Sequence, residues 1–137
     1  MLIVGINGSP NKEGNVACLL RVALEAAGSR GAATQVIHIM DALAGQEKPY
    51  CDACSSPCDK SCFEGTSLSD AFDLLRKADG LILASPVYFG TVSAQLKAFW
   101  DKTRFMRTEN ALVGKPGGAI AVGASRFGGQ ETTLRTL

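Results

Sequence analysis

The chain has 137 residues, 46% of them hydrophobic, and its 14 basic and 13 acidic residues leave a formal net charge of +1. This length predicts one domain with a single hydrophobic core, and the balanced charge argues against a nucleic-acid-binding or basic membrane-binding surface. The N-terminus resembles no secretory signal, and no run approaches the roughly 18 apolar residues of a membrane span. We therefore expect a cytoplasmic protein whose thiols stay reduced.

Strand-like and helix-like segments alternate along the chain. Apolar, β-branched runs predict four strands, at residues 2–7, 34–40, 81–90 and 117–125, the third of which runs into a loop. Helical patterns predict helices at residues 15–28, 67–80 and 92–106, and a further loop and helix from residue 126. Asn15 and Ser69 are expected to cap the first two helices. This order predicts an α/β fold in which helices cover both faces of a parallel sheet.

The loops that follow parallel strands lie at one edge of the sheet, the carboxyl edge, where such folds bind ligands. The first loop, "GSPNKEGN" at residues 8–15, joins a strand to a helix N-terminus, which favours phosphate binding. Ser9 and Asn15 can donate hydrogen bonds to a phosphate, and Lys12 adds a positive charge. A plain glycine-rich turn is the alternative, because the loop matches neither the Walker motif nor the dinucleotide-binding fingerprint.

Two later loops complete the carboxyl edge. The segment "SPVYFG" at residues 85–90 offers the aromatic rings of Tyr88 and Phe89, and "GASRFGG" at residues 123–129 is rich in small residues. Together these loops suit a flat ring whose polar edge is bound by backbone N–H groups. For one of the two aromatic residues, packing in the core is the expected role.

Four cysteines lie within the segment "CDACSSPCDKSC" at residues 51–62. A reducing compartment and short loops argue against disulfides. Zinc ribbons usually split their ligands into two distant pairs, whereas one compact loop of four thiolates is closer to the ligand pattern of a [4Fe–4S] cluster. We therefore expect Cys51, Cys54, Cys58 and Cys62 to bind a [4Fe–4S] cluster, with zinc or no metal as the alternatives. Because the segment follows the second predicted strand, we expect it to lie at the same edge of the sheet as the three loops.

Three other residues with reactive side chains have ordinary structural interpretations. Cys18 lies in a helical pattern among alanines and leucines, and we expect it to be buried as a small apolar residue. His38, the only histidine, lies in a predicted strand and is expected to be packed there. Asp41 follows that strand and is interpreted as a solvated loop residue.

Three longer segments carry a resemblance to a known family. "GINGSPNKEGN", "SPVYFGTVSAQLKAFWDKT" and "GGAIAVGASRFGGQETTL" resemble, in order and spacing, the signature segments of the NADPH-dependent FMN reductase-like flavoproteins. With the cysteine segment added, the chain is similar to the iron–sulfur flavoprotein branch of that family. The resemblance covers nearly all of the chain. It implies a flavodoxin-like, doubly wound parallel sheet of order 2-1-3-4(-5), with FMN bound between strands one and three.

The resemblance also implies a domain boundary. Residues 1–137 are expected to form a single FMN-binding domain that carries the cysteine loop. The family normally continues through a fifth strand and a last helix, which this chain lacks. The domain is therefore expected to be incomplete at its C-terminus, or to have its fourth strand covered by something else, such as a partner chain.

The FMN-binding residues implied by the resemblance fall into three groups. Those around the phosphate are Ser9, Asn11, Lys12, Gly14, Asn15 and Val16. Those along the ribityl chain and the ring are Pro86, Val87, Tyr88, Phe89 and Gly90. Those on the other side of the ring are Ala124, Ser125, Arg126 and Gly129. The family often has threonine where Val16 stands, so one hydroxyl donor to the phosphate is lost.

These observations predict a flavin-dependent oxidoreductase that couples FMN to a [4Fe–4S] cluster. The cofactors carry the chemistry, so no catalytic side chain is expected. The resemblance implies a ferredoxin-like or nicotinamide electron donor and a homo-dimer or tetramer, with no nucleic-acid or membrane partner. One alternative is an NAD(P)H-dependent FMN or quinone reductase with a structural or metal-free cysteine loop. The other is a non-enzymatic module that has lost the flavin.

Overall fold

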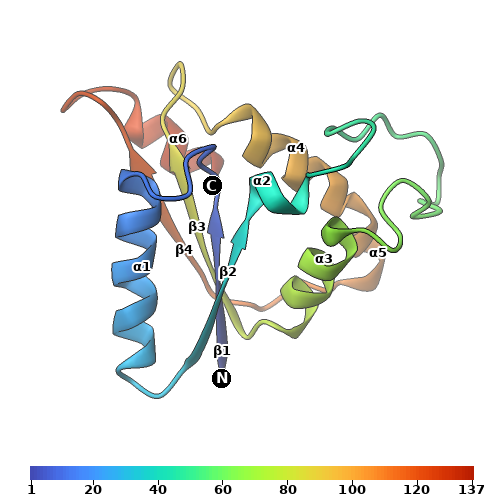
Figure 1. Ribbon diagram of the computed structural model, residues 1–137, viewed down its shortest axis with the longest axis horizontal. Helices are drawn as coiled ribbons and strands as arrows, with labels where there is room; N and C mark the ends of the chain where they lie inside the picture. The colour runs from blue at the N-terminus through green and yellow to red at the C-terminus, as the bar shows by residue number, and fades with distance from the viewer.

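A computed structural model describes all residues from Met1 to Leu137. Its centre is a four-stranded, all-parallel sheet of order β2-β1-β3-β4, which confirms the predicted strand order (Figure 1). The strands are β1 (Leu2–Asn7), β2 (Ala33–His38), β3 (Gly80–Pro86) and β4 (Gly117–Val122). All four point the same way, so the loops after β1, β3 and β4 meet at the carboxyl edge.

The helices occupy the crossovers between these strands. They are α1 (Asn15–Gly28), α2 (Ile39–Ala42), α3 (Ser67–Lys77), α4 (Ala94–Lys102), the 3₁₀ turn η1 (Thr103–Phe105), α5 (Met106–Glu109) and α6 (Gln130–Thr136). The bounds of α1 agree with the prediction. The expected second strand is shorter, because its last two residues begin α2, and the expected third helix is divided among α4, η1 and α5.

Helices cover both faces of the sheet, because alternate residues of each strand point in opposite directions. On one face, Val4 and Ile6 of β1 are fully buried in a large core with α2, α3 and α4. On the other face, Leu20 and Leu24 of α1 pack against strand residues that include Ile3. Figure 1 shows α1 on the left of the sheet and α2 to α5 on the right.

The larger core contains four phenylalanines that touch one another. Phe72 of α3 lies 5.6 Å from Phe99 of α4 and 5.2 Å from Phe105 of η1, measured between ring centroids. Phe63, which directly follows the cysteine segment, lies 4.9 Å from both Phe72 and Phe105. The end of the cysteine segment is therefore anchored in the core.

Both expected helix caps are wrong. The N-cap of α1 is Gly14, and Asn15 is the first residue of the helix. The N-cap of α3 is Thr66, whose Oγ1 accepts a hydrogen bond from the Leu68 amide at 3.3 Å. Ser69 lies inside the helix. Thr66 succeeds as a cap because its extended backbone leaves its side chain facing the free amides of the first turn.

Cys18 also differs from its expected role. It lies on the exposed face of α1, and its sulfur is 3.9 Å from an Arg21 guanidinium nitrogen. The buried positions of the helix are Val16, Leu20 and Leu24, so the apolar stripe passes beside Cys18. None of the helices combines the length and the apolar character that a membrane crossing needs.

Candidate functional site

The loop after β1, residues 8–14, is ordered by its own side chains. The Ser9 amide donates to Asn7 Oδ1 at 3.0 Å, and the Asn11 amide donates to Ser9 Oγ at 3.1 Å. The Glu13 amide donates in turn to Asn11 Oδ1 at 2.9 Å. Asn7 and Ser9 are buried. Its own side chains thus fix the backbone of this loop, as a preorganised binding loop requires.

The N-terminus of α1 offers free backbone donors to this loop. No side chain caps the helix, and its first turn contains no acidic residue. The first amide with a partner inside the helix is that of Cys18, which bonds to the Gly14 carbonyl at 3.0 Å. The amides of Asn15, Val16 and Ala17 therefore remain available to an anion, and the helix dipole favours one. Val16 buries its side chain in the α1 core and can contribute only its amide.

Lys12 is the cation of this loop, and it is already paired. Its ammonium forms an ion pair with Asp41 of α2. Both side chains are about half exposed, with relative accessibilities of 48% and 60%. Asp41, which we expected in a solvated loop, thus lies in the helix α2 and contacts the binding loop through Lys12.

Gly8 and Ser93 join the first loop to β3 and α4. The Gly8 amide donates to the Ala84 carbonyl at 2.7 Å, and the Ser93 hydroxyl donates to the Gly8 carbonyl at 2.5 Å. Ser93 is fully buried, and its Oγ also accepts a hydrogen bond from the Leu96 amide at 3.1 Å. Sequence reasoning missed this residue, although a serine just before an apolar helical run is a usual cap signal.

The loop after β3 presents two aromatic rings to solvent. Tyr88 and Thr91 exchange backbone hydrogen bonds of 3.0 and 3.1 Å around a tight turn. Phe89 and Gly90 form the turn with φ values of 52° and 75°. Tyr88 is 45% exposed and Phe89 is completely exposed, so the expected core packing of one of them is wrong. An exposed phenylalanine in a left-handed turn conformation is a costly arrangement that suits a ligand-facing surface.

The loop after β4 lies directly beside this turn. A Cβ atom on Gly129 would lie 2.7 Å from the Gly90 Cα, so the two loops approach as closely as glycines allow. The Thr132 hydroxyl bonds to the Gly90 carbonyl. Gln130 closes the loop on itself, because it accepts from the Gly128 amide at 2.8 Å and donates to the Ser125 carbonyl at 2.6 Å. The sequence offered no signal for Gln130 or Thr132.

The three loops thus form one surface at the carboxyl edge, at the top of Figure 1. The predicted FMN residues of all three loops are brought to this edge by the parallel strands. Free amides lie at the α1 end of the surface and exposed aromatic rings at the β3 end. A phosphate joined to a planar ring fits this division of chemistry.

The cysteine segment leaves the carboxyl edge after α2 and extends sideways, beyond the C-terminal end of α4 (Figure 1). Three contacts besides Phe63 hold it there. Arg104 donates to the Ser55 carbonyl at 2.6 Å, Lys60 forms an ion pair with Glu109 at 3.1 Å, and Cys58 packs against the main core. We expected this segment to lie next to the flavin loops, but its contacts come from α3, from the C-terminal end of α4, and from η1 and α5.

All four cysteines of the segment line one cavity of about 380 Å³, which we call the cysteine cavity. Its lining includes Lys102 and Arg104 but no residue of the three flavin loops. The cysteines are free thiols, and no three histidine, cysteine, aspartate or glutamate side chains of the chain are gathered closely enough to hold a metal ion. The donor chemistry fits a cluster, and the thiols would have to close inward to ligate one.

Several charged side chains near the cysteine cavity have ion-pair or hydrogen-bond partners. Lys48 lies 2.7 Å from Asp52, and this hydrogen bond lowers the pKa of the Asp52 carboxyl and raises that of the lysine. The Ser61 amide and hydroxyl lower the pKa of Asp59. Glu109 accepts from Arg76 at 2.9 Å and from Lys60, which together lower its pKa. Glu109 therefore ties the cysteine segment to α3.

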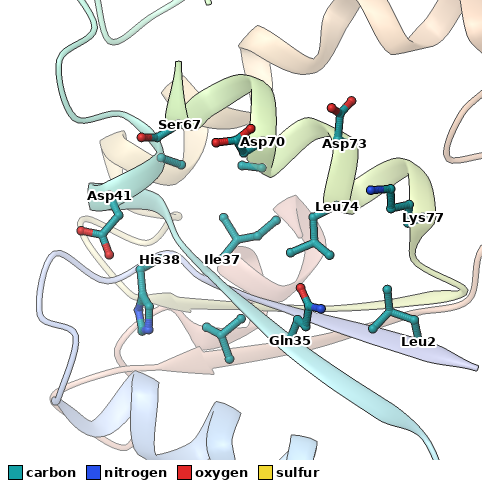
Figure 2. Close-up of a pocket in the computed structure, with 13 residues that line it drawn as sticks. Leu2, Gln35, Ile37, His38, Asp41, Ser67, Asp70, Asp73, Leu74 and Lys77 are labelled. Carbon is teal, nitrogen blue, oxygen red and sulfur yellow. The ribbon is translucent and has the colours of Figure 1, made fainter. Parts of the chain in front are cut away.

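A separate cavity of about 530 Å³ lies between β2 and α3 (Figure 2). Its lining includes His38, Asp41 and three charged residues of α3, namely Asp70, Asp73 and Lys77. His38 ends β2, and its Nδ1 lies 3.2 Å from the side-chain nitrogen of Asn7. This cavity contains no cysteine and no residue of the three loops, so it is not part of the surface described above.

Comparison with known proteins agrees with this geometry. The family model described as NADPH-dependent FMN reductase matches residues 1–137, so the chain belongs to that family of flavoproteins. Its relatives include an iron–sulfur flavoprotein of Methanocaldococcus jannaschii, 45% identical over 142 residues, which covers 100% of this chain and 69% of the relative. Another is an iron–sulfur flavoprotein of Methanosarcina thermophila, 40% identical, for which the shares are 100% and 71%.

Solved structures confirm the flavodoxin-like fold. An NADH:FMN oxidoreductase in its apo form matches with a TM-score of 0.73 and 28% identity, over 98% of this chain and 64% of that one. A WrbA-like flavodoxin of Agrobacterium tumefaciens matches with a TM-score of 0.64 and 20% identity, over 99% and 67%. The chain thus spans about two thirds of the length of these proteins. Membership of this family identifies the chain as a flavin-dependent oxidoreductase, and the family supports FMN as its flavin.

Proposed function

We propose that this chain binds FMN at the carboxyl edge of its sheet and one [4Fe–4S] cluster in the cysteine cavity, and that it passes electrons between one-electron and two-electron partners. The observation that carries the proposal is that all four thiols of one short segment line a single cavity. When bound, FMN would supply exchange of one or two electrons and the cluster exchange of one.

The chain's own residues would bind and orient the flavin. The free amides of Asn15 and Val16 suit the phosphate, and the hydrogen bonds made by Ser9 hold the loop in place. The exposed rings of Tyr88 and Phe89 would cover the isoalloxazine. The close approach of Gly90 and Gly129 leaves backbone groups, rather than side chains, to bond the polar edge of the ring.

The cysteine segment would hold the cluster through thiolates, the ligands that iron–sulfur centres require. The segment is anchored at its C-terminal end by Phe63 and near its middle by the bond from Arg104 to Ser55, while Cys54 and Cys62 are exposed. Because the core holds the segment at only two points and these thiols are exposed, the segment can close around a cluster without unfolding the core. The iron–sulfur flavoprotein names of two relatives, 45% and 40% identical, support this assignment.

We infer partners from the same chemistry. A ferredoxin-like protein suits a one-electron centre as donor, and a nicotinamide suits the flavin. A homo-dimer or tetramer would cover the exposed side of β4, whose residues are open or half-buried. Sedimentation of the purified protein with its cofactors measures this directly, and a monomer at micromolar concentration would contradict the oligomer.

The test begins with anaerobic purification, followed by an absorption spectrum and assays of iron and flavin. We expect both cofactors, and we expect Cys54→Ala to lose iron while keeping FMN. The matched control is Cys18→Ala, which removes a thiol from α1 outside the cysteine cavity and should keep both. If Cys54→Ala keeps its full iron content, the ligand assignment is wrong.

A second function is favoured by two comparisons. An NAD(P)H dehydrogenase (quinone) of Chromohalobacter salexigens is 41% identical over 64 residues, covering 47% of this chain and 32% of that protein. The NADH:FMN oxidoreductase shares the fold at 28% identity. An NAD(P)H-dependent FMN or quinone reductase with a metal-free cysteine loop would show flavin bleaching by NADPH and no iron after anaerobic purification.

A further inference from the structure

Lys102 is a buried cation that the flavin site does not use. It is the last residue of α4, and only 4% of its surface is exposed. Lysine is almost never buried to this extent without an anionic partner, because removing its charge from water is costly. A group close to the Lys102 ammonium must therefore offset this cost.

No carboxylate of this chain offsets it. The ion pairs of the structure, all within 4.0 Å, do not include Lys102. Its Nζ atom instead donates to Gln46 Oε1 at 3.2 Å and lies 3.7 Å from Cys62 Sγ. Asp52 lies near enough for its pKa to be lowered, but mainly by its hydrogen bond to Lys48 and only weakly by Lys102.

The position of the ammonium is fixed by a polar network. Gln46 Nε2 donates to Thr66 Oγ1 at 3.1 Å, which turns the Gln46 carbonyl towards Lys102. Thr66 is itself held as the N-cap of α3. A basic residue in the last turn of a helix complements the helix dipole. An exposed lysine would do this equally well, so the dipole does not explain why Lys102 is buried. The network holds the charge against the cysteine cavity, which Lys102 helps to line.

We propose that Lys102 is the counter-charge of the four-thiolate centre and that it raises the centre's reduction potential. The proposal rests on the proposed function. Four thiolates make such a centre anionic, and reduction by one electron from an external donor adds one more negative charge without forming or breaking a bond. A fixed positive charge that is itself buried stabilises the reduced form more than the oxidised form. Lys102 is thus an electrostatic residue and not a catalytic one.

The experiment is a redox titration of the iron-loaded protein, followed by electron paramagnetic resonance. We expect Lys102→Met to lower the equilibrium constant for one-electron reduction of the cluster by roughly tenfold, a fall of about 59 mV in potential. Lys102→Arg keeps the charge and should keep the potential. Lys97→Met is the matched control, because it removes a lysine from the same helix at a position whose side chain is 56% exposed.

The outcomes separate the two proposals. If the wild type contains no iron, the proposed function fails and this inference falls with it. If wild type and Lys102→Met both carry the cluster at the same potential, only the inference is wrong. If Lys102→Met loses iron but keeps FMN, Lys102→Gln is titrated in its place. If both neutral variants lose iron and Lys102→Arg keeps it, the result supports Lys102 as the counter-charge. If Lys102→Arg loses iron to the same extent, Lys102 acts through packing and the proposal is wrong.

Discussion

Ser93 and Gly8 are joined by a buried hydrogen bond of 2.5 Å from the serine hydroxyl to the glycine carbonyl. The same hydroxyl caps α4. We expect Ser93→Ala to lower the free energy of unfolding by about 1 kcal/mol, the usual cost of a lost cap, and also to weaken FMN binding because the first loop loses its tie to α4. Chemical denaturation and FMN titration measure the two effects.

Thr66→Ala provides the control for this prediction. Thr66 caps α3, so its loss should cost a similar free energy of unfolding, but its hydroxyl bonds only to Gln46, Phe63 and Leu68 and to no flavin loop. FMN affinity should therefore stay at the wild-type value in Thr66→Ala. If the two variants lose FMN equally, the effect of Ser93 comes from general destabilisation.

The close packing of Gly8 leads to a second prediction. A Cβ atom at this position would lie 2.7 Å from the Ala84 carbonyl oxygen and 2.8 Å from a Leu96 methyl group. We expect Gly8→Ala to cost about 1–3 kcal/mol of the free energy of unfolding, as overpacking usually does. Gly28→Ala is the contrast, since no atom lies within 4 Å of its Cβ and alanine favours the helix by up to about 1 kcal/mol. A thermal melt that shifts Gly8→Ala upward would contradict this account.

The phosphate assignment gives a third prediction. Ser9→Ala combined with Asn15→Ala removes the hydroxyl that accepts from the Asn11 amide and a side chain at the start of α1. FMN retention should fall far more than iron content, because neither residue lines the cysteine cavity. Assays of both cofactors in one preparation decide the matter. Parallel loss of iron and FMN would indicate unfolding instead.

Glu109 gives a pH-dependent prediction. Its hydrogen bonds with Arg76 and Lys60 hold its pKa below the ordinary value. The ion pairs therefore contribute stability above the unfolded-state value of about 4.3, and the contribution is lost as the pH falls through the lower, folded-state value. Between pH 7 and pH 3 the wild type should lose more free energy of unfolding than Glu109→Gln. Glu131→Gln, which removes a carboxylate without any ion pair, should lose as much as the wild type.

Periodicity was sufficient for β1 and for α1, because each of these elements buries apolar residues at regular spacing. Val16, Leu20 and Leu24 recur at helical spacing, and Val4 and Ile6 alternate towards the core. The helical crossovers predicted that the strands run parallel. Parallel strands bring the three distant loops to one edge of the sheet. The order of the strands came from the family resemblance and not from the pattern itself.

The sequence pattern did not predict the short elements or the geometry of the turns. The first two residues of α2 continue an apolar run that favours a strand, but α2 is helical and packs Ile39 and Ala42 against the core. Phe89 carries a core-forming side chain, but its φ of 52° at a tight turn directs it to solvent. In both cases tertiary contacts determined the local structure, and no local sequence pattern indicates such contacts.

The place of the cysteine segment was also unpredictable. Its spacing indicates a ligand set, but its location depends on Phe63 entering the aromatic core and on Arg104 reaching Ser55 across 49 residues of chain. Such contacts carry no sequence signature. The result is that α4 joins the two candidate sites, with Ser93 at one end and Lys102 at the other, about 14 Å apart along nine helical residues.

That helix also contains the chain's single tryptophan, Trp100, which is 36% exposed. Its ring therefore stands within about 10 Å, along the helix axis, of both ends. Indole emission should be quenched by an isoalloxazine at one end or by iron at the other. One native fluorophore can thus follow the loading of either centre, in any order of addition, without a label.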